Sequence, residues 1–371
     1  MERNQKRVWF DCRMVFVLIL GFAARLWVGR FGHNYDFDSY LIVLDALGGG
    51  QNVYSSTPRY NYGPVWFNAI GIIYDLVARN QDAFRIVLVV FLSLIDAGIF
   101  LIIWKRFGRI AAGLFFLNPI SIIITGYHNQ FDNGAILLGM ISVELFGDDF
   151  SGPLNWRKLS GLLLLGFSLM TKHILFAFPL WLAMKQEKTA HKIIVLLLPI
   201  TVFVLGFFPY WSDGAQGIVR NVWFCGIARN EYLYRLLRPQ ALRAIIPAKI
   251  IWLLILGGFA FYFKRRKGLE SLLLYTSVLV WASPSIANQY LAIPAAFLAV
   301  FFNPFSLAYM LVGTWHLIVD YDGLHFPSLQ QYADRDVYYA SLVILLLAAF
   351  IWEVWGGQIR RVLVKYAQMR K

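Results

Sequence analysis

Apolar stretches of about 17–21 residues, the length that crosses a bilayer core as an α-helix, recur along the whole chain. Short polar segments separate them. A soluble core could not bury so many such stretches, so the pattern predicts an all-α polytopic membrane protein. The clearest stretches are residues 14–28, 84–104, 193–208, 245–263 and 338–355.

The basic residues between these stretches predict the topology, because cytoplasmic loops carry an excess of lysine and arginine. Every basic cluster falls inside if residues 65–77 lie along the interface instead of crossing. Both termini are then cytoplasmic, and residues 1–371 form a single membrane domain with about twelve transmembrane helices (roughly 10–13). The expected spans are residues 14–29, 84–104, 109–126, 133–147, 158–173, 174–184, 193–209, 245–263, 270–285, 290–302, 304–319 and 337–356.

This topology has two long extracytoplasmic loops, residues 29–82 and 209–244, and polar chemistry gathers on their side of the membrane. Ionisable groups retained near membrane depth usually face a cavity or a partner, because lipid exposure is costly. We therefore expect a site that faces outward and is supplied from the bilayer. Within the membrane, Asp96 could serve as a proton relay or form helix-to-helix hydrogen bonds.

Composition supports the membrane class: 59% of residues are hydrophobic and only 15% are charged, against about 25% charged in a typical soluble domain. The net charge of +13 raises the question of a nucleic-acid partner. Because the basic residues form clusters between apolar stretches, we expect no nucleic acid. No spacing of metal ligands occurs in the sequence, and we expect no metal or cofactor.

The first long loop contains two carboxylates, Asp36 and Asp38. They could serve as a general base and its orienting partner, as a cation site, or as an ordinary helix cap. Further along the loop, the aromatic segment 60–66 is either a belt at the membrane interface or a surface that stacks on sugars. The sequence leaves both choices open.

The third predicted span ends in an unusual polar motif, residues 128–132, with the sequence His-Asn-Gln-Phe-Asp. A plain hydrophilic loop is the ordinary explanation. However, such a loop does not require this density of hydrogen-bonding side chains beside aromatic residues.

Taken together, these motifs resemble the GT-C superfamily of membrane glycosyltransferases, which use dolichyl- or polyprenyl-phosphate sugars. Asp36-Phe37-Asp38, Tyr60–Pro64, Asp96 and Ser283–Tyr290 resemble the catalytic subunit of GPI mannosyltransferase I. Asp36 together with residues 128–132 is more similar to the dolichyl-phosphate-glucose glucosyltransferases. Both groups have a lysine where Lys172 stands, whereas their usual pattern has Thr or Pro where Gly63 stands.

The resemblance implies an inverting glycosyltransferase that moves a hexose, mannose before glucose, from the lipid phosphate to a lipid-linked or cell-envelope glycan. Asp36 takes the place of the general base, and Asp38 is the second choice. For Asp96, the resemblance favours helix-to-helix hydrogen bonds over a proton relay. Lys172, Arg229, Arg235 and Arg238 are the candidates for binding the donor phosphate. Candidates for the sugar or acceptor are Tyr62, His128, Gln130, Asp132, Gln289 and Tyr290.

The implied partners are the lipid-phosphate sugar, the glycan or glycolipid acceptor and membrane lipid, and a small membrane partner subunit is compatible with the resemblance. The short chain, without a retrieval signal, favours the bacterial inner membrane over the endoplasmic reticulum. Two alternatives remain: a secondary transporter of a small polar solute or lipid-linked glycan, and a non-catalytic scaffold subunit. Transporters often contain internal repeats with broken helices near the midplane, and no such paired segments occur here.

Overall fold

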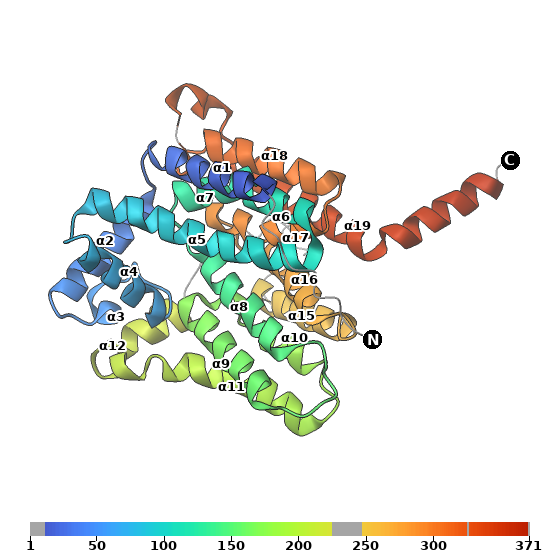
Figure 1. Ribbon diagram of the computed structural model, residues 1–371, viewed down its shortest axis with the longest axis horizontal. Coiled ribbons are helices and arrows are strands. Elements are labelled where there is room, and N and C mark those ends of the chain that lie inside the picture. Colours follow the sequence, from blue (N-terminus) through green and yellow to red (C-terminus); the bar gives the residue numbers. More distant parts are fainter. Residues whose placement is uncertain (1–11, 225–246, 325, 370–371) are drawn as a thin grey trace.

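The computed structural model describes residues 12–224, 247–324 and 326–369, which form helices and no β-strand. The prediction of an all-α fold is confirmed for this part of the chain. Figure 1 shows long helices running side by side, short helices gathered at one end, and the last helix projecting from the other end.

The N-terminal third of the chain supplies one side of the bundle and most of one end. Helices α1, α5, α6 and α7 lie along the bundle, and α2, α3 and α4 cover its end (Figure 1). We call this the α2–α4 end. The bounds are α1 (Cys12–Gly29), α2 (Tyr35–Gly48), α3 (Val53–Ser56), α4 (Pro64–Leu76), α5 (Gln81–Phe107), α6 (Arg109–Phe116) and α7 (Pro119–Gly126).

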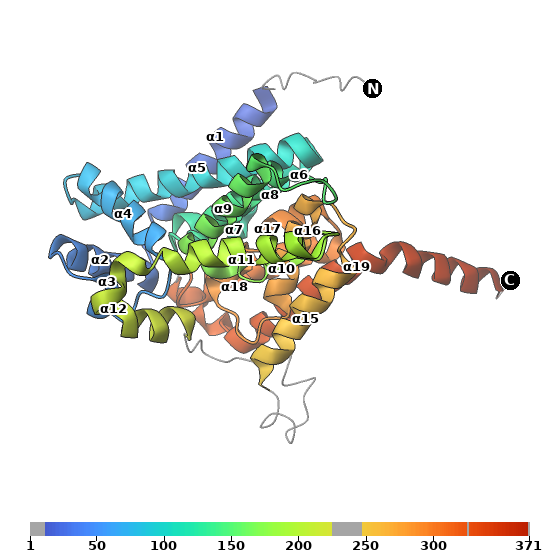
Figure 2. The ribbon, with the colours of Figure 1, turned by 90° about the horizontal axis from the view of Figure 1, so that it is seen from below.

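The middle third packs below the first, with α8 between α5, α9 and the later helix α16 (Gly268–Trp281). Its last elements return to the α2–α4 end, where α12 packs on α3 (Figure 2). The bounds are α8 (Asp132–Phe146), α9 (Trp156–Thr171), η1 (His173–Leu175), α10 (Phe178–Ala183), α11 (Thr189–Leu205), η2 (Phe208–Tyr210), α12 (Trp211–Gly217) and η3 (Ile218–Trp223).

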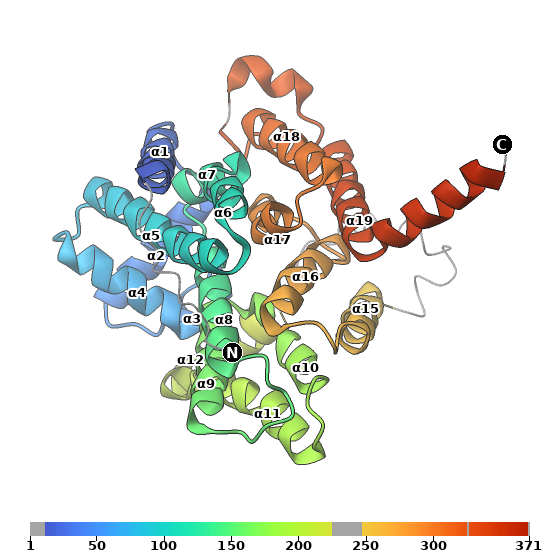
Figure 3. The same ribbon diagram turned by 45° about the vertical axis from the view of Figure 1, so that its right-hand side comes forward.

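The C-terminal third closes the bundle opposite α1 and α5, as Figure 3 shows. Its helix α18 packs on both α7 and α19 and so connects the last helix to the first half of the chain. The remaining bounds are α15 (Ala248–Tyr262), η4 (Asn288–Ala292), α17 (Ala295–Val300), α18 (Pro304–Val319), η5 (Pro327–Tyr332) and α19 (Arg335–Met369).

Four helical segments among the described residues are long and apolar enough to cross a membrane, and a bent pair would make a fifth. The predicted spans 245–263 and 304–319 correspond to shorter apolar helices, α15 and α18, which are not among these four. The prediction of a transmembrane span at residues 174–184 is wrong, because the helix there, α10, has only six residues and is about 9 Å long. Pro179 near its start and the turn at η1 limit the helix there.

The bent pair is the predicted span 109–126, which the structure divides into α6 and α7 with a bend of 45°. Pro119 cannot donate a hydrogen bond to the preceding turn, and the Asn118 side chain accepts from the N–H of Ile120 instead. The Phe116 carbonyl at the end of α6 then accepts from the Arg25 side chain of α1 at 3.0 Å. A neighbouring helix therefore satisfies the interrupted backbone, as expected inside a membrane.

Arg25 also joins a buried polar cluster around Asp96, which we call the Asp96 cluster. The Asp96 carboxylate accepts from Arg25 Nε at 3.0 Å, Thr125 Oγ1 at 2.8 Å and Asn133 Nδ2 at 2.6 Å. These residues come from α1, α5, α7 and α8, so the cluster ties four helices together. The expectation that Asp96 forms helix-to-helix hydrogen bonds agrees with this geometry.

The expected interfacial segment 65–77 corresponds to α4, whose 13 residues make a helix about 20 Å long. It is therefore too short to cross a hydrocarbon core of about 30 Å. One face, with Trp66, Phe67 and Ile70, is buried in a second hydrophobic core beneath α2. The other face exposes Ile72 and Leu76. This two-sided character suits a helix that lies along a membrane surface.

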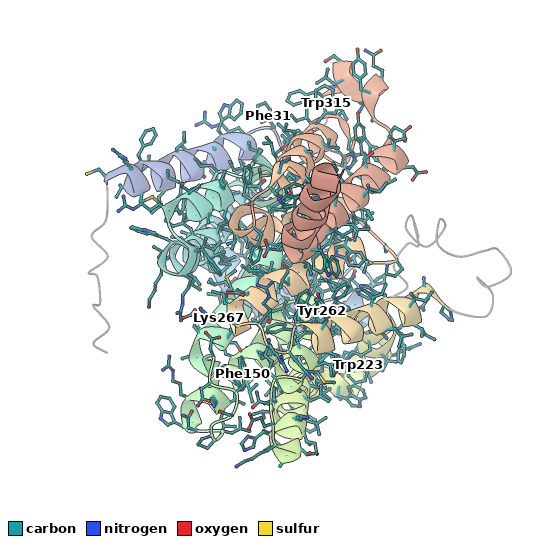
Figure 4. All side chains as sticks on the ribbon, turned by 90° about the vertical axis from the view of Figure 1, so that its right-hand side faces the viewer. Phe31, Phe150, Trp223, Tyr262, Lys267 and Trp315 are labelled. Carbon is teal, nitrogen blue, oxygen red and sulfur yellow. The ribbon has the colours of Figure 1, made fainter. Side chains whose placement is uncertain are left out.

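Loops gather at the end of the bundle opposite α2–α4, which faces the viewer in Figure 4. Phe150 and Lys267 lie close to one another there, where the α8–α9 and α15–α16 connections meet (Figure 4). The Gly268 N–H donates to Asp148, and Lys185 Nζ donates to the carbonyls of Phe263 and Arg266. Lysine thus caps the end of α15, where carbonyls lack partners.

Candidate active site

The start of α2 separates the two acidic residues of the first loop. Asn34 caps the helix, since its side-chain oxygen accepts from the N–H of Asp36 at 3.1 Å. Two residues along a helix correspond to a rotation of about 200°. Asp36 consequently faces the protein, whereas Asp38 is 52% exposed and lies 3.7 Å from His33 Nδ1.

The connection between α7 and α8 brings the polar motif 128–132 against Asp36. His128 is fully buried, and its Nδ1 lies 2.7 Å from Asn34 Nδ2. The same Asn34 amide donates to Asp36 Oδ2 at 3.0 Å. Asn129 adopts a positive φ of 54°, and its carbonyl accepts from the Tyr40 hydroxyl of α2 at 3.2 Å. The motif is therefore fixed to α2 at two points.

Lys172 lies at the C-terminus of α9 and reaches the same place from another side. Its ammonium group donates to Asp132 Oδ2 at 2.7 Å and to Gln130 Oε1 at 3.0 Å. It also lies over the rings of Tyr62, at 4.9 Å, and Phe131, at 4.8 Å. The structure thus brings together six of the predicted site residues: Asp36, Tyr62, His128, Gln130, Asp132 and Lys172. We call these residues, with Asn34, the Asp36 cluster.

Aromatic side chains pack beneath the Asp36 cluster. Trp66 stacks on Phe131 with ring centroids 3.9 Å apart, and Tyr62 meets Phe131 edge-on at 4.9 Å. Tyr60 and Trp66 are almost fully buried. An interfacial belt would face the lipid headgroups, so the burial of these two residues excludes that explanation for them. Tyr62 is half-buried beside Lys172.

Opposing influences act on the Asp36 carboxyl. Burial raises the pKa of Asp36 above its usual range, and the neighbouring Asp132 charge raises it further. The Asn34 hydrogen bond, the charge of Lys172 and the Gln130 side chain lower that pKa. The effect of burial is larger, so the pKa of Asp36 remains raised. A carboxylate with a raised pKa is a stronger base than one in water.

Late helices add a second polar group that the sequence interpretation missed, and we call it the Asn288 group. Asn288 in η4 donates to Asp320 Oδ2 at 2.8 Å and accepts from the Tyr339 hydroxyl at 2.7 Å. His316 Nε2 lies 2.8 Å from the same Asn288 oxygen, and Arg335 pairs with Asp320 at 2.9 Å. Although burial raises the pKa of Asp320, the Arg335 and Asn288 hydrogen bonds hold it below its usual range.

The remaining predicted site residues lie apart from these contacts or beyond the described residues. Gln289 and Tyr290 follow Asn288 in η4 and are half-buried, and Tyr290 packs against the main apolar core. Arg229, Arg235 and Arg238 fall in residues 225–246, outside the described part of the chain. Only the position of Asn288 next to the predicted pair could have pointed to the Asn288 group.

A groove of about 220 Å³ lies between α2 and α4, lined in part by Leu44, Leu47, Ile72 and Asp75. None of the predicted site residues lines it. Asp75 forms an ion pair with Arg79 at 3.0 Å on its rim. The groove therefore belongs to the surface of the α2–α4 end and not to the Asp36 cluster.

Several buried polar atoms around the Asp36 cluster and the Asn288 group have no hydrogen-bond partner among the described residues. Buried polar groups are nearly always paired, so such a concentration indicates a place where a ligand or water completes the bonding. Among residues 12–224, 247–324 and 326–369, no group of three His, Cys, Asp or Glu could hold a metal ion. The unpaired atoms include Trp66 Nε1, His128 Nε2, Asn129 Oδ1, Asp132 Oδ1 and His316 Nδ1.

Comparison with known proteins identifies the fold. No family model and no curated protein matches the sequence. Two crystal structures of ArnT from Cupriavidus metallidurans are similar in fold over most of this chain, one in the apo state and one bound to undecaprenyl phosphate. Sequence identity is 10% and 12%, and the TM-score is 0.50 in both cases. The matches cover 93% and 94% of this chain and 76% and 77% of theirs.

The chain therefore shares the all-helical fold of these two ArnT structures, which agrees with the fold that the sequence motifs predict. The sequence identity is too low to carry over an activity or a substrate from ArnT.

Proposed function

We propose that the protein is an inverting glycosyltransferase that takes a sugar from a polyprenyl-phosphate carrier. The observation that carries this proposal is the placement of Asp36: a half-buried carboxylate with a raised pKa, beside a buried lysine, within a GT-C fold. The ArnT structure with bound undecaprenyl phosphate supports a lipid phosphate as the carrier.

In the proposed reaction, an acceptor hydroxyl attacks the anomeric carbon of the donor as the bond to the lipid phosphate breaks. Asp36 accepts the hydroxyl proton late, when positive charge develops on the attacking oxygen. The products are the new glycosidic bond and the free lipid phosphate. Attack from the side opposite the phosphate inverts the anomeric centre. Holding the two substrates in line supplies much of the rate.

The leaving phosphate needs positive charge, and Lys172 is the described residue best placed to supply it. Its ammonium group has three donors, of which two are used by Gln130 and Asp132. The third donor is then available for a phosphate oxygen. Arg229, Arg235 and Arg238 remain candidates for the same role. Tyr62 and Asp132, which flank Lys172, would contact the sugar or the acceptor, and Gln289 and Tyr290 remain candidates for the same role.

The charge distribution favours an active site on the extracytoplasmic face with both termini in the cytoplasm. We favour the bacterial inner membrane, with the endoplasmic reticulum as the alternative, and a hexose donor with mannose before glucose. The acceptor would be a lipid-linked or cell-envelope glycan. A small membrane partner subunit is compatible with this assignment.

The test is direct transfer by the purified protein in nanodiscs. The protein is incubated with farnesyl-phosphate mannose, glucose and other sugars, and release of farnesyl phosphate is measured by mass spectrometry. Envelope glycans from cells without the gene supply the acceptor, and those from cells with the gene contain the expected product. We expect one donor to be consumed, with an inverted linkage in the product. Absence of turnover and of binding for every donor, with the protein folded, would refute the proposal.

A further inference from the structure

Two buried histidines, one from each half of the chain, present complementary unpaired atoms. Their ring tautomers can be assigned because each ring is held by an asparagine whose own orientation is fixed. The assignment starts from groups whose hydrogen-bonding role is certain: a backbone N–H in one case and an ionised carboxylate in the other.

Asn34 fixes the first ring. Its side-chain oxygen must face the backbone N–H of Asp36, which can only donate, so its amide nitrogen faces Asp36 Oδ2 and His128 Nδ1. His128 Nδ1 therefore accepts a hydrogen bond, and the ring carries its proton on Nε2. This Nε2–H is a donor on a fully buried side chain, and it has no partner among the described residues.

Asn288 fixes the second ring. Its amide nitrogen must face Asp320 Oδ2, which can only accept, so its oxygen accepts from His316 Nε2 and from the Tyr339 hydroxyl. His316 therefore carries its proton on Nε2 as well, and its Nδ1 presents a lone pair. That acceptor also lies on a fully buried side chain and has no partner among the described residues.

The two rings belong to elements that pack together, since α7, which directly precedes His128, packs on both α18 and η4. Burial lowers the pKa of His128 to about 3, Asp320 raises it, and His316 lowers it further. Asp320 and His316, both from the Asn288 group, therefore act electrostatically on the His128 ring. Since that ring is neutral near pH 7, the tautomer assignment holds under working conditions.

We infer that His128 Nε2–H and His316 Nδ1 form a subsite for one substrate hydroxyl, which accepts from His128 and donates to His316. A hydroxyl group satisfies both atoms at once, whereas a carboxylate or phosphate oxygen would face the His316 lone pair without a proton to donate. The inference rests on the proposed function and adds a specificity determinant to it. It assigns a substrate-binding role to His316. The hydrogen bonds and the ion pair among Asn288, Asp320, Arg335 and Tyr339 hold the His316 ring in place.

The location gives this subsite a consequence for transfer. Asn34 bonds both the Asp36 carboxylate and the His128 ring, so the hydroxyl subsite is linked to the proposed base through one side chain. A sugar or acceptor that fills it would be oriented relative to the base. Sites built to bond a substrate hydroxyl discriminate strongly against analogues that lack it, because their buried polar groups are then left unpaired.

Two substitutions test the subsite while keeping each structural hydrogen bond. In His316→Gln, the amide nitrogen can still donate to Asn288, but the acceptor at Nδ1 is lost. In His128→Asn, the side-chain oxygen can still accept from Asn34, but the donor at Nε2 is lost. His191→Gln in α11, outside both clusters, is the matched control. Thermal unfolding in detergent shows whether each variant folds.

The measurement is kcat/KM for the preferred donor and acceptor and for their single-deoxy analogues. With full substrates, we expect each histidine variant to lose about 10–100-fold and the control to change little. With the one analogue that lacks the bound hydroxyl, that loss should disappear. An equal loss for every analogue would mean that the two histidines hold only water, and it would overturn the subsite.

The subsite can fail separately from the proposed function. If the wild-type protein turns over no lipid-phosphate sugar, the proposed function has failed, and solid-state ¹⁵N NMR of histidine-labelled protein still tests the pair. Both rings should be protonated on Nε2, and methyl mannoside or methyl glucoside should shift the His128 and His316 signals together. A different tautomer, or no response of either ring, would overturn the inference.

Discussion

The Asp96 cluster and the Asp36 cluster are both buried, both contain an aspartate paired with a cation, and both join several helices, yet their bonding differs. In the Asp96 cluster, Arg25, Asp96 and Thr125 are all hydrogen-bonded to one another or to nearby groups. In the Asp36 cluster, His128 and Asp132 each retain a buried polar atom without a partner among the described residues. A complete network favours one fixed packing of helices, whereas an incomplete one leaves bonds for a substrate.

Removing the proposed base should nearly abolish transfer without disturbing the packing of either cluster. Asp36→Asn keeps the size of the side chain but removes its ability to accept the acceptor proton. We expect transfer to fall by about 10³-fold, within the range for general base catalysis, while binding of a farnesyl-phosphate sugar persists. Turnover and donor binding are measured on the same nanodisc preparation.

Asp38→Asn is the matched control, because Asp38 is largely exposed on the opposite side of α2. We expect it to change turnover less than tenfold, the range expected when no proton transfer is lost. Near-normal turnover in Asp36→Asn, or a larger loss in Asp38→Asn, would remove Asp36 from the role of base.

The complete network should respond in stability and not in chemistry. Asp96→Leu leaves the fully buried Arg25 guanidinium without its carboxylate, which typically costs about 3–5 kcal/mol. We therefore expect a large drop in the thermal unfolding temperature, measured in detergent. Donor binding per folded molecule should stay near the wild-type value.

Replacing both partners, as in Arg25→Met with Asp96→Leu, should recover much of this stability, because neither charge is then left unpaired. Loss of transfer in a well-folded Asp96→Leu protein would instead show that the Asp96 cluster takes part in the reaction.

The contrast between the two clusters also marks what the sequence could and could not predict. Asp36, the motif 128–132 and Lys172 could be assigned to one site because they end or follow apolar segments on one predicted side. The choice between Asp36 and Asp38 depended on local conformation. An extended loop would place both on one face, and only the cap at Asn34 makes the segment helical and turns Asp38 away.

The Asn288 group illustrates what could not be predicted. Asn288, His316 and Tyr339 are separated by up to 51 residues in the chain, and all lie more than 150 residues after His128. No local pattern relates them, because they meet only through the packing of α18 and η4 on α7 and of α19 on α18. Pro119 by contrast is visible in the sequence as an interruption of an apolar run, and only the size of the bend, 45°, depends on the packing.

The next prediction concerns the cation of the Asp36 cluster. Lys172→Met should weaken binding of the farnesyl-phosphate donor by about 10–100-fold, the loss of one charged hydrogen bond. It should also change the pH profile of kcat/KM. The charge of Lys172 lowers the pKa of Asp36, so its removal raises that pKa. Since the base must be ionised, the acid limb should move to higher pH.

Lys158→Met serves as the control for charge alone, because Lys158 pairs with Asp149 in the α8–α9 connection, away from the Asp36 cluster. We expect its acid limb to coincide with that of the wild type. An unchanged donor affinity in Lys172→Met would end the assignment of Lys172 to the phosphate, even if the acid limb moved.

Gly63, at the edge of the Asp36 cluster, offers a modest test of packing without any change in chemistry. Gly63 stands where the enzymes that the sequence motifs resemble usually have Thr or Pro, and a Cβ there would lie 1.9 Å from the Met170 carbonyl oxygen near the end of α9. The clash is with backbone, so no side chain can rotate to relieve it. Gly63→Ala should therefore lower stability by about 1–3 kcal/mol and displace the neighbouring Tyr62 from Lys172. Gly71→Ala, in the same helix α4, meets only Leu47 at an ordinary 3.4 Å and should be neutral or slightly stabilising. Unfolding temperatures and donor affinities of the two variants can be compared directly. If Gly63→Ala matched Gly71→Ala in unfolding temperature and in donor affinity, the close approach of α4 to α9 would not be what fixes Tyr62. The position of the Tyr62 ring beside Lys172 would then depend on its contact with Phe131.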